Sequence, residues 1–357
     1  MVAPRVTNNR GLHPGAWWIW ALGLSVAATL TLNPWVTGSV ILIAIAMVYL
    51  RRTDAPWAMS FRLYLWLALA IVIIRIVFKV LLGQSYGGLV LLDLPEIALP
   101  DWAAGISLLG PITSGAILSG LYEGMQLAAI VIAFGAANTL ANPKRLLKSL
   151  PPALYEIGTA VVVALALFPQ LGESINRVRR AQDLRSDETK GVRKLRRIFV
   201  PVLEDAFDRS LILAAGMDVR GYGRSGGATK KQRAITGALL LAAIVAMGVG
   251  FYALLDQGTS RLLAWPVVFS SLLLAVAGFH FAGKRVTRTR YRPDPWEMNE
   301  NFTAAAGLFV PIALAFTFVE PVNLTSFPMV SWQVMAIMFV GFVPLITTPQ
   351  PQAVLVR

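Results

Sequence analysis

Long apolar runs, separated by short polar connections, constrain this chain more than any other feature. A helix needs about 20 apolar residues to cross a hydrocarbon core of about 30 Å. Lipid leaves the backbone no partner for its polar groups except itself. With 56% hydrophobic residues, the sequence predicts an all-α polytopic membrane protein with about eight transmembrane helices. The expected spans are 16–32, 35–50, 61–82, 113–138, 235–255, 262–283, 302–319 and 329–347.

The connections between these runs indicate the orientation of the chain. Basic residues gather in cytoplasmic loops. The 51–62 connection is rich in arginine and the 142–150 connection holds Lys144, Arg145 and Lys148, whereas 83–112 has no Lys or Arg. We therefore expect the 83–112 loop outside the cell membrane and both chain termini in the cytoplasm.

Residues 153–168 form a further apolar run that conflicts with this pattern. Basic residues lie on both sides of it, it is short, and Pro169 interrupts it. We expect 152–185 to form one long helix that lies in the cytoplasmic half of the bilayer without crossing. An ordinary span over 152–170 is the alternative.

A charged, amphipathic stretch at 173–224 stands apart from the oily remainder. Its second half has the apolar spacing of a helix face, with Pro201 expected in the first turn. Gly221 follows Arg220 as a C-terminal stop, because glycine enters the left-handed conformation without a Cβ clash. Arg220 should then project past the last turn. The expected face consists of Leu203, Phe207, Leu211, Ala214 and Met217.

Two similar endings within this stretch carry a family resemblance. AQDLRS at 181–186 and GMDVRGYG at 216–223 resemble the paired Ala-Arg-Gly-type signatures of the transmembrane T subunit of energy-coupling factor (ECF) transporters, the EcfT/CbiQ-like family. Val219 replaces the usual alanine, and the first signature has Leu184 and Ser186 around its arginine. ANPKRLLKSLPP, from 141 onward, and Leu-His-Pro at 12–14 also fit. The resemblance covers about 10–255.

This resemblance implies a scaffold and coupling subunit of an ATP-driven importer for a vitamin or a metal ion such as cobalt. Two cytoplasmic ATP-binding cassette ATPases and a small substrate-capturing membrane subunit are the implied partners, within the lipid bilayer. The residues implied in ATPase docking are Ala181, Gln182, Arg185, Arg220 and Gly221. The chain itself is expected to be no enzyme and to hold no cofactor.

The expected organisation has three parts. Residues 1–141 form an N-terminal transmembrane bundle, 142–233 form interfacial and cytoplasmic coupling helices, and 234–357 form C-terminal transmembrane helices. The last three spans are an extension that is atypical of the family.

Other function classes find little support in the residues. The net charge of +13 could suggest nucleic acid, but the basic residues lie between apolar spans. Cysteine is absent, and neither a phosphate-binding lysine motif nor a paired-histidine spacing occurs. A self-contained secondary carrier and a lipid-modifying membrane enzyme are the alternative functions.

A few polar and aromatic residues lie near membrane edges. Arg75 and Lys79 are four residues apart on one helix face, and Glu123 lies near the outer end of the next span. An intramembrane ion pair or snorkelling explains them, and contact with a partner's substrate path is the functional alternative. His13 is expected as a cap, and Trp17, Trp18 and Trp20 are expected as an interfacial aromatic belt.

Overall fold

The computed structural model is predominantly helical. It describes residues 11–53, 61–82, 87–95, 97–98, 107–149, 154–184, 192–222, 229–256, 261–283, 294–317, 322–323 and 327–349. The helices are α1 (Pro14–Thr29), α2 (Pro34–Arg51), α3 (Phe61–Leu81), α4 (Ser114–Leu140), α5 (Pro143–Lys148), α6 (Tyr155–Leu184), α7 (Val192–Val219), α8 (Lys230–Leu255), α9 (Arg261–Gly283), α10 (Met298–Phe316), α11 (Trp332–Val340) and α12 (Val343–Thr347).

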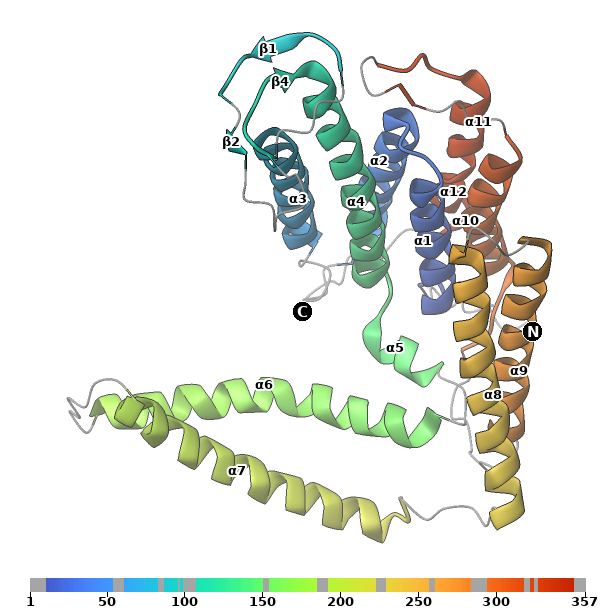
Figure 1. The fold of residues 1–357 in the computed structure, drawn as a ribbon. Coiled ribbons are helices and arrows are strands. Elements are labelled where there is room, and N and C mark those ends of the chain that lie inside the picture. Colours follow the sequence, from blue (N-terminus) through green and yellow to red (C-terminus); the bar gives the residue numbers. More distant parts are fainter. Residues whose placement is uncertain are drawn as a thin grey trace, which may run out of the picture. The chain divides into compact units, whose positions relative to one another are not determined.

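Four short strands lie in the described residues between α3 and α4, where the sequence predicted only a loop. They are β1 (Val90–Leu92), β2 (Ile97–Ala98), β3 (Ser107–Leu108) and β4 (Ile112–Thr113). β1 pairs antiparallel with β4 (Figure 1), and β2 pairs antiparallel with β3. Because these strands are only two or three residues long, they leave the predicted all-α class intact.

Six helices in the described part of the chain are long and apolar enough to cross a membrane. They are α2, α3, α4, α6 from Ile157 onward, α8 and α9. Residues Trp332–Thr347 form a shorter apolar helix, and α1 has 16 residues. Length and composition support a polytopic protein, whereas the number of eight spans stays a prediction. They also do not decide whether α6 crosses.

The chain forms two compact units. One contains residues 1–146 together with 294–357, and the other contains 147–293. The expected grouping of 234–357 as one C-terminal part differs from this division. α8 and α9 belong to the second unit, whereas α10, α11 and α12 belong with the N-terminal helices. The expected three-part organisation stays a prediction.

The core of the first unit explains why α10 belongs there. Gly23 of α1 and Gly307 of α10 lie so close that a Cβ at Gly23 would overlap the Gly307 backbone. Trp20 is fully buried, and its indole Nε1 donates to the Gly341 carbonyl at 3.1 Å. Trp17 is 5% exposed. The predicted aromatic belt is therefore wrong for these two residues, because both lie in the hydrophobic core of the first unit.

Helix starts follow the local chemistry of the sequence. Asn33 caps α2 by accepting from the Trp35 amide at 2.9 Å, directly before Pro34. His13 caps α1, since its Nδ1 accepts from the Gly15 amide at 3.1 Å. The expectation of a cap at His13 is confirmed. Such caps satisfy amides that the first helical turn leaves without a partner.

Candidate functional site: the α6–α7 pair and its helix ends

The charged stretch folds as two long helices. α6 is a continuous helix of 30 residues in which Pro169 causes no break, as predicted for 152–185. α7 has 28 residues and contains Pro201 in its interior. The expected place of Pro201 in the first turn is therefore wrong. Residues 192–200 continue the helix upstream, at the cost of the one backbone hydrogen bond that proline cannot donate.

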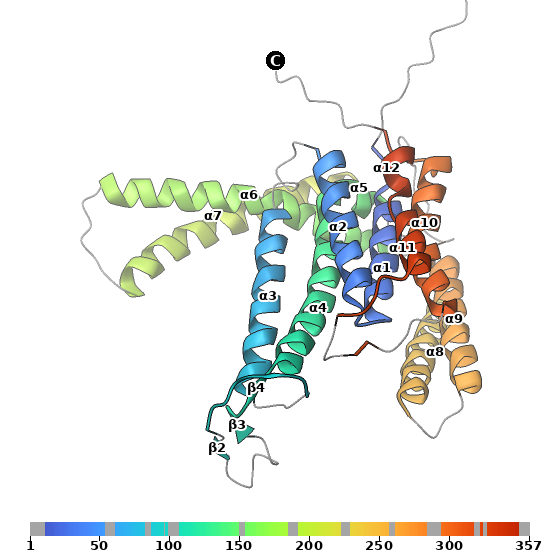
Figure 2. The ribbon, with the colours of Figure 1, turned by 90° about the horizontal axis from the view of Figure 1, so that it is seen from above.

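Polar side chains join the two helices near their midpoints. Figures 1 and 2 show α6 and α7 running in opposite directions. Arg177 of α6 forms an ion pair with Asp205 of α7 at 2.9 Å. Arg209 contacts Asp205 at 3.1 Å and donates to Gln170 of α6 at 3.2 Å. These contacts fix the crossing point of the pair.

The carboxylate of Asp205 is the centre of this crossing. The Ser174 hydroxyl, which is buried, together with Arg209 and Arg177, holds the pKa of the Asp205 carboxyl below its usual value. The charged form is favoured because hydroxyl and guanidinium donors stabilise a carboxylate. Asp205 is therefore ionised throughout the physiological range.

The predicted apolar face of α7 lies uncovered within this chain. The exposed fractions are 41% for Leu203, 60% for Phe207 and 67% for Leu211. Ala214 is also exposed, and Met217 is partly buried. Side chains of this size are seldom exposed along a whole helix face of a stable subunit. The face is therefore suited to contact lipid or another protein.

α7 ends in a tightly hydrogen-bonded cap. Gly221 has φ +74°, and its amide donates to the Asp218 carbonyl at 2.9 Å. The Tyr222 amide donates to the Met217 carbonyl at 3.0 Å. This pair of bonds is the Schellman arrangement, in which a left-handed residue closes the helix. The predicted stop at Gly221 is confirmed, and exposed Arg220 stands at the end of a fixed helix.

The first signature is described only in part. Arg185 lies outside the described residues. Ala181 and Gln182 occupy the last turn of α6, Ala181 exposed and Gln182 partly buried. Because α6 and α7 run in opposite directions, their C-terminal ends point away from each other. At about 1.5 Å per residue, the 28 residues of α7 set these ends roughly 40 Å apart.

The predicted intramembrane ion pair is a group of three residues. Lys79 Nζ lies 2.9 Å from Glu123 Oε1, and Arg75 Nη1 lies 3.4 Å from Glu123 Oε2. The side chains are 13%, 45% and 26% exposed for Lys79, Arg75 and Glu123. Lys79 therefore makes the tighter contact, and the carboxylate partly neutralises both cations.

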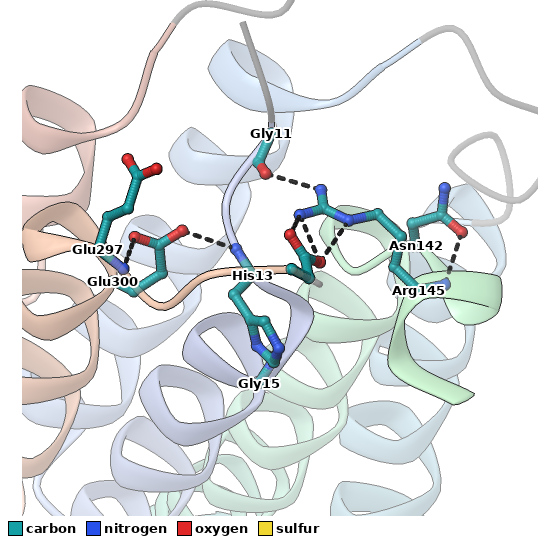
Figure 3. Close-up of polar contacts among 8 residues, drawn as sticks. Gly11, His13, Gly15, Asn142, Arg145, Glu297 and Glu300 are labelled. Carbon is teal, nitrogen blue, oxygen red and sulfur yellow. Dashed lines mark hydrogen bonds and ion pairs between the residues drawn. The ribbon is translucent and has the colours of Figure 1, made fainter. Parts of the chain in front are cut away.

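A second polar cluster lies within the first unit at the start of α5 (Figure 3), and its acidic residues were not predicted from the sequence. The Arg145 guanidinium binds Asp294 through two nitrogens, at 2.9 and 2.8 Å, and donates to the Gly11 carbonyl at 2.7 Å. Glu300 accepts from the His13 amide at 3.0 Å and from the Glu297 amide at 3.1 Å. Asp294 and Glu300 follow a strongly basic connection, and that contrast was the available signal.

The junction also contains a helix start whose chemistry is local. Asn142 accepts from the Arg145 amide at 3.4 Å, and Pro143 is the first residue of α5. Asparagine followed by proline is a favourable helix start. The start of the coupling region and the segment before α10 are thus held together by charge.

No group of three or more His, Cys, Asp or Glu residues that could hold a metal ion occurs in the described part of the chain. The clusters described above are ion pairs and caps. Their chemistry suits the fixing of helices.

Comparison with known protein families gives a match. A family model described as CbiQ, cobalt transport protein, matches residues 6–232, more than half of the chain. The matched region ends just after the start of α8 and includes the α6–α7 pair with both signatures. No curated protein matches the chain.

Proposed function

Since this chain belongs to the CbiQ cobalt transport protein family, the family of ECF transporter T subunits, we propose that it is the scaffold and coupling subunit of an ECF-type importer. Family membership makes it a multi-pass membrane component of a transport system. The coupling role, the partner set and the location in the cell membrane with cytoplasmic termini are parts of the proposal.

The observation that carries the proposal is the end of α7. Arg220 is exposed, and the cap at Gly221 fixes the helix end on which it stands. A guanidinium offers five donors in a rigid fork, which suits carboxylates and carbonyls in a partner's groove. Because the backbone at this helix end is already fixed, binding loses less conformational entropy when the Arg220 side chain becomes ordered.

The arrangement of α6 and α7 supports two docking points. Their C-terminal ends point in opposite directions, so the two signatures would meet two different surfaces. We assign Arg185 and Arg220, each with its neighbours, to two cytoplasmic ATPase subunits. ATP binding changes the distance between those subunits and thereby the crossing angle of α6 and α7.

The uncovered face of α7 supplies the second contact. Leu203, Phe207 and Leu211 would pack against the membrane subunit that captures the substrate. Transport then depends on a difference in packing between the two ATPase states, because only differential contacts shift a conformational equilibrium. In this proposal the chain binds no nucleotide and breaks no bond.

Co-purification from the native membrane in mild detergent tests this function. The chain should bring down ATP-hydrolysing subunits and a small membrane protein. Reconstitution of the chain alone should give no substrate uptake. Uptake without a partner would indicate a secondary carrier, and turnover of a lipid would indicate a membrane enzyme.

A further inference from the structure

β1 presents apolar side chains at an unexpected place, in the connection outside the spans. The exposed fractions are 77% for Leu89, 58% for Val90, 58% for Leu91 and 54% for Leu92. Successive side chains of a strand point to opposite faces. Both faces of this segment are therefore apolar and uncovered by the chain.

The register of α3 against α4 shows where β1 lies relative to these two helices. Near one end, Asn138 donates to the Tyr64 hydroxyl at 2.7 Å. Toward the other end, Lys79 pairs with Glu123 at 2.9 Å. The helices are thus antiparallel and nearly level. The closest backbone approaches lie nearer the outer end, where Gly120 faces Ile76 and Gly124 faces Val72. Continuing this backbone register places Ser114, the first residue of α4, beside Leu82, directly after the end of α3.

The length of α3 then sets the depth of this end. Its 21 residues give about 31 Å at 1.5 Å per residue, which matches a hydrocarbon core of about 30 Å. When α3 crosses the bilayer, both Leu81 and Ser114 lie at the boundary between acyl chains and headgroups. This boundary is the outer one, because the connection 83–112 contains no Lys or Arg.

Hydrogen bonds tie β1 to that boundary. The Leu89 amide donates to Ser114 Oγ at 3.1 Å, and the Ser114 amide donates to the Leu89 carbonyl at 2.9 Å. Gly87 and Gly88 precede the strand with φ +75° and +92°. These left-handed positions let the chain turn back toward α4 where other residues would be strained. β1 therefore cannot move far from the start of α4.

We propose that β1 with Leu89 is a bilayer anchor, in which the apolar side chains at 89–92 lie among the acyl chains of the outer leaflet. The strand continues the exposed apolar surface of α3, where Phe78 is 56% and Leu81 is 43% exposed. Asp93 follows directly after Leu92, and its charged side chain lies in water in this proposal. Lipid accounts for both exposed faces, whereas a protein partner on one face would leave the other in water.

The absence of cysteine from the sequence makes a clean test possible. Single-cysteine variants Val90→Cys, Leu91→Cys and Asp93→Cys of the full chain are labelled with an environment-sensitive nitrobenzoxadiazole dye. The proteins are reconstituted in phosphatidylcholine nanodiscs with and without lipids that carry a doxyl quencher near the headgroup. Asp93→Cys controls for the dye's own attraction to lipid.

The anchor predicts blue-shifted emission and strong quenching for the dye at 90 and 91, and water-like, weakly quenched emission at 93. Equal, water-like signals at all three positions would overturn it. Protection at 90 and 91 that resists the doxyl lipid and appears only in the complete transporter would also overturn it, by showing a protein cover. None of these outcomes depends on ATPase docking, so the anchor and the coupling role are tested separately.

Discussion

The guanidinium of Arg145 binds both carboxylate oxygens of Asp294, with Nε–Oδ2 at 2.9 Å and Nη2–Oδ1 at 2.8 Å. Arg145 lies near the start of the coupling region, within the family match. Asp294 lies beyond the end of that match. Both side chains are 27% exposed. The segment after residue 293 is therefore a structural part of the family bundle, although the family model ends before it.

Asp294→Asn should destabilise the first unit. The amide keeps the shape of the side chain but removes the charge that Arg145 binds. We therefore expect the free energy of unfolding to fall by about 1–3 kcal/mol. Thermal unfolding of the purified protein in detergent measures this loss. Asp208→Asn, at an exposed position on α7, is the matched control and should change the melting temperature little. Equal melting temperatures for both variants would show that the pair contributes nothing.

Gly221→Ala and Gly216→Ala should have opposite effects on α7. Alanine at 221 must adopt φ +74°, which costs about 1–2 kcal/mol. Gly216 is inside the helix with open space around it, so alanine there should stabilise α7 by roughly 0.5–1 kcal/mol. Hydrogen exchange of the last turn of α7 reads out both changes. Faster exchange in Gly216→Ala, or unchanged exchange in Gly221→Ala, would contradict this assignment of the cap.

Glu123→Gln should weaken the protein more than Arg75→Gln. Loss of the carboxylate removes the contacts of Glu123 with both Arg75 and Lys79, whereas loss of Arg75 keeps the 2.9 Å contact of Lys79. Unpaired charge near hydrocarbon costs on the order of 2 kcal/mol. Melting temperatures of the two variants show which is less stable. Substrate uptake by the complete transporter shows whether the three charged residues also contribute to transport. Stability loss with normal uptake assigns them a structural role alone.

The α6–α7 crossing should be insensitive to pH over the physiological range. The depressed pKa of Asp205 means that its contribution is present above the ordinary value of about 3.9. It is lost only as pH falls through the lower folded-state value. Spin labels at Glu173→Cys and Asp208→Cys report the separation of the helices. The distance should stay constant from about pH 8 to 4.5.

Asp205→Asn is the control for this pH prediction. Removing the charge should widen or broaden the same distance distribution at neutral pH, because Arg177 and Arg209 lose their shared partner. A wild-type distance that changes between pH 7 and 5 would assign the crossing to another titrating group.

Local chemistry made several features predictable from the sequence. Asn142 and Pro143 predict a helix start, and Gly221 predicts a helix end. The short apolar run at 153–168, with basic residues on both sides, predicts the single long helix over 152–185. Each depends on neighbours in the chain. Pro201 shows the limit of such reasoning, because a strong helical context on both sides overrides a residue that is favoured in a first turn.

Contacts between helices that are distant in the chain could not be predicted from the sequence. Gly23 and Gly307 are 284 positions apart, and nothing in either local pattern indicates that their backbones touch. The burial of Trp20 and the pairing of Arg145 with Asp294 depend on the same packing of α10. Of the site itself, the face of α7 and its capped end followed from periodicity and from glycine. What touches that face depends on other proteins, and a single chain carries no direct signal of them.

The most direct test of the coupling role compares Arg220→Glu with Lys230→Glu in the complete transporter. Both variants reverse one charge within residues 142–233, and Lys230 is an exposed residue at the first position of α8. Loss of an anchor at the centre of an interface costs about 2 kcal/mol or more, a drop in affinity of roughly thirtyfold. The proposal predicts that Arg220→Glu inserts normally but loses an ATPase subunit on purification and loses ATP-driven uptake, whereas Lys230→Glu keeps both. Wild-type ATPase association and uptake in Arg220→Glu would contradict it.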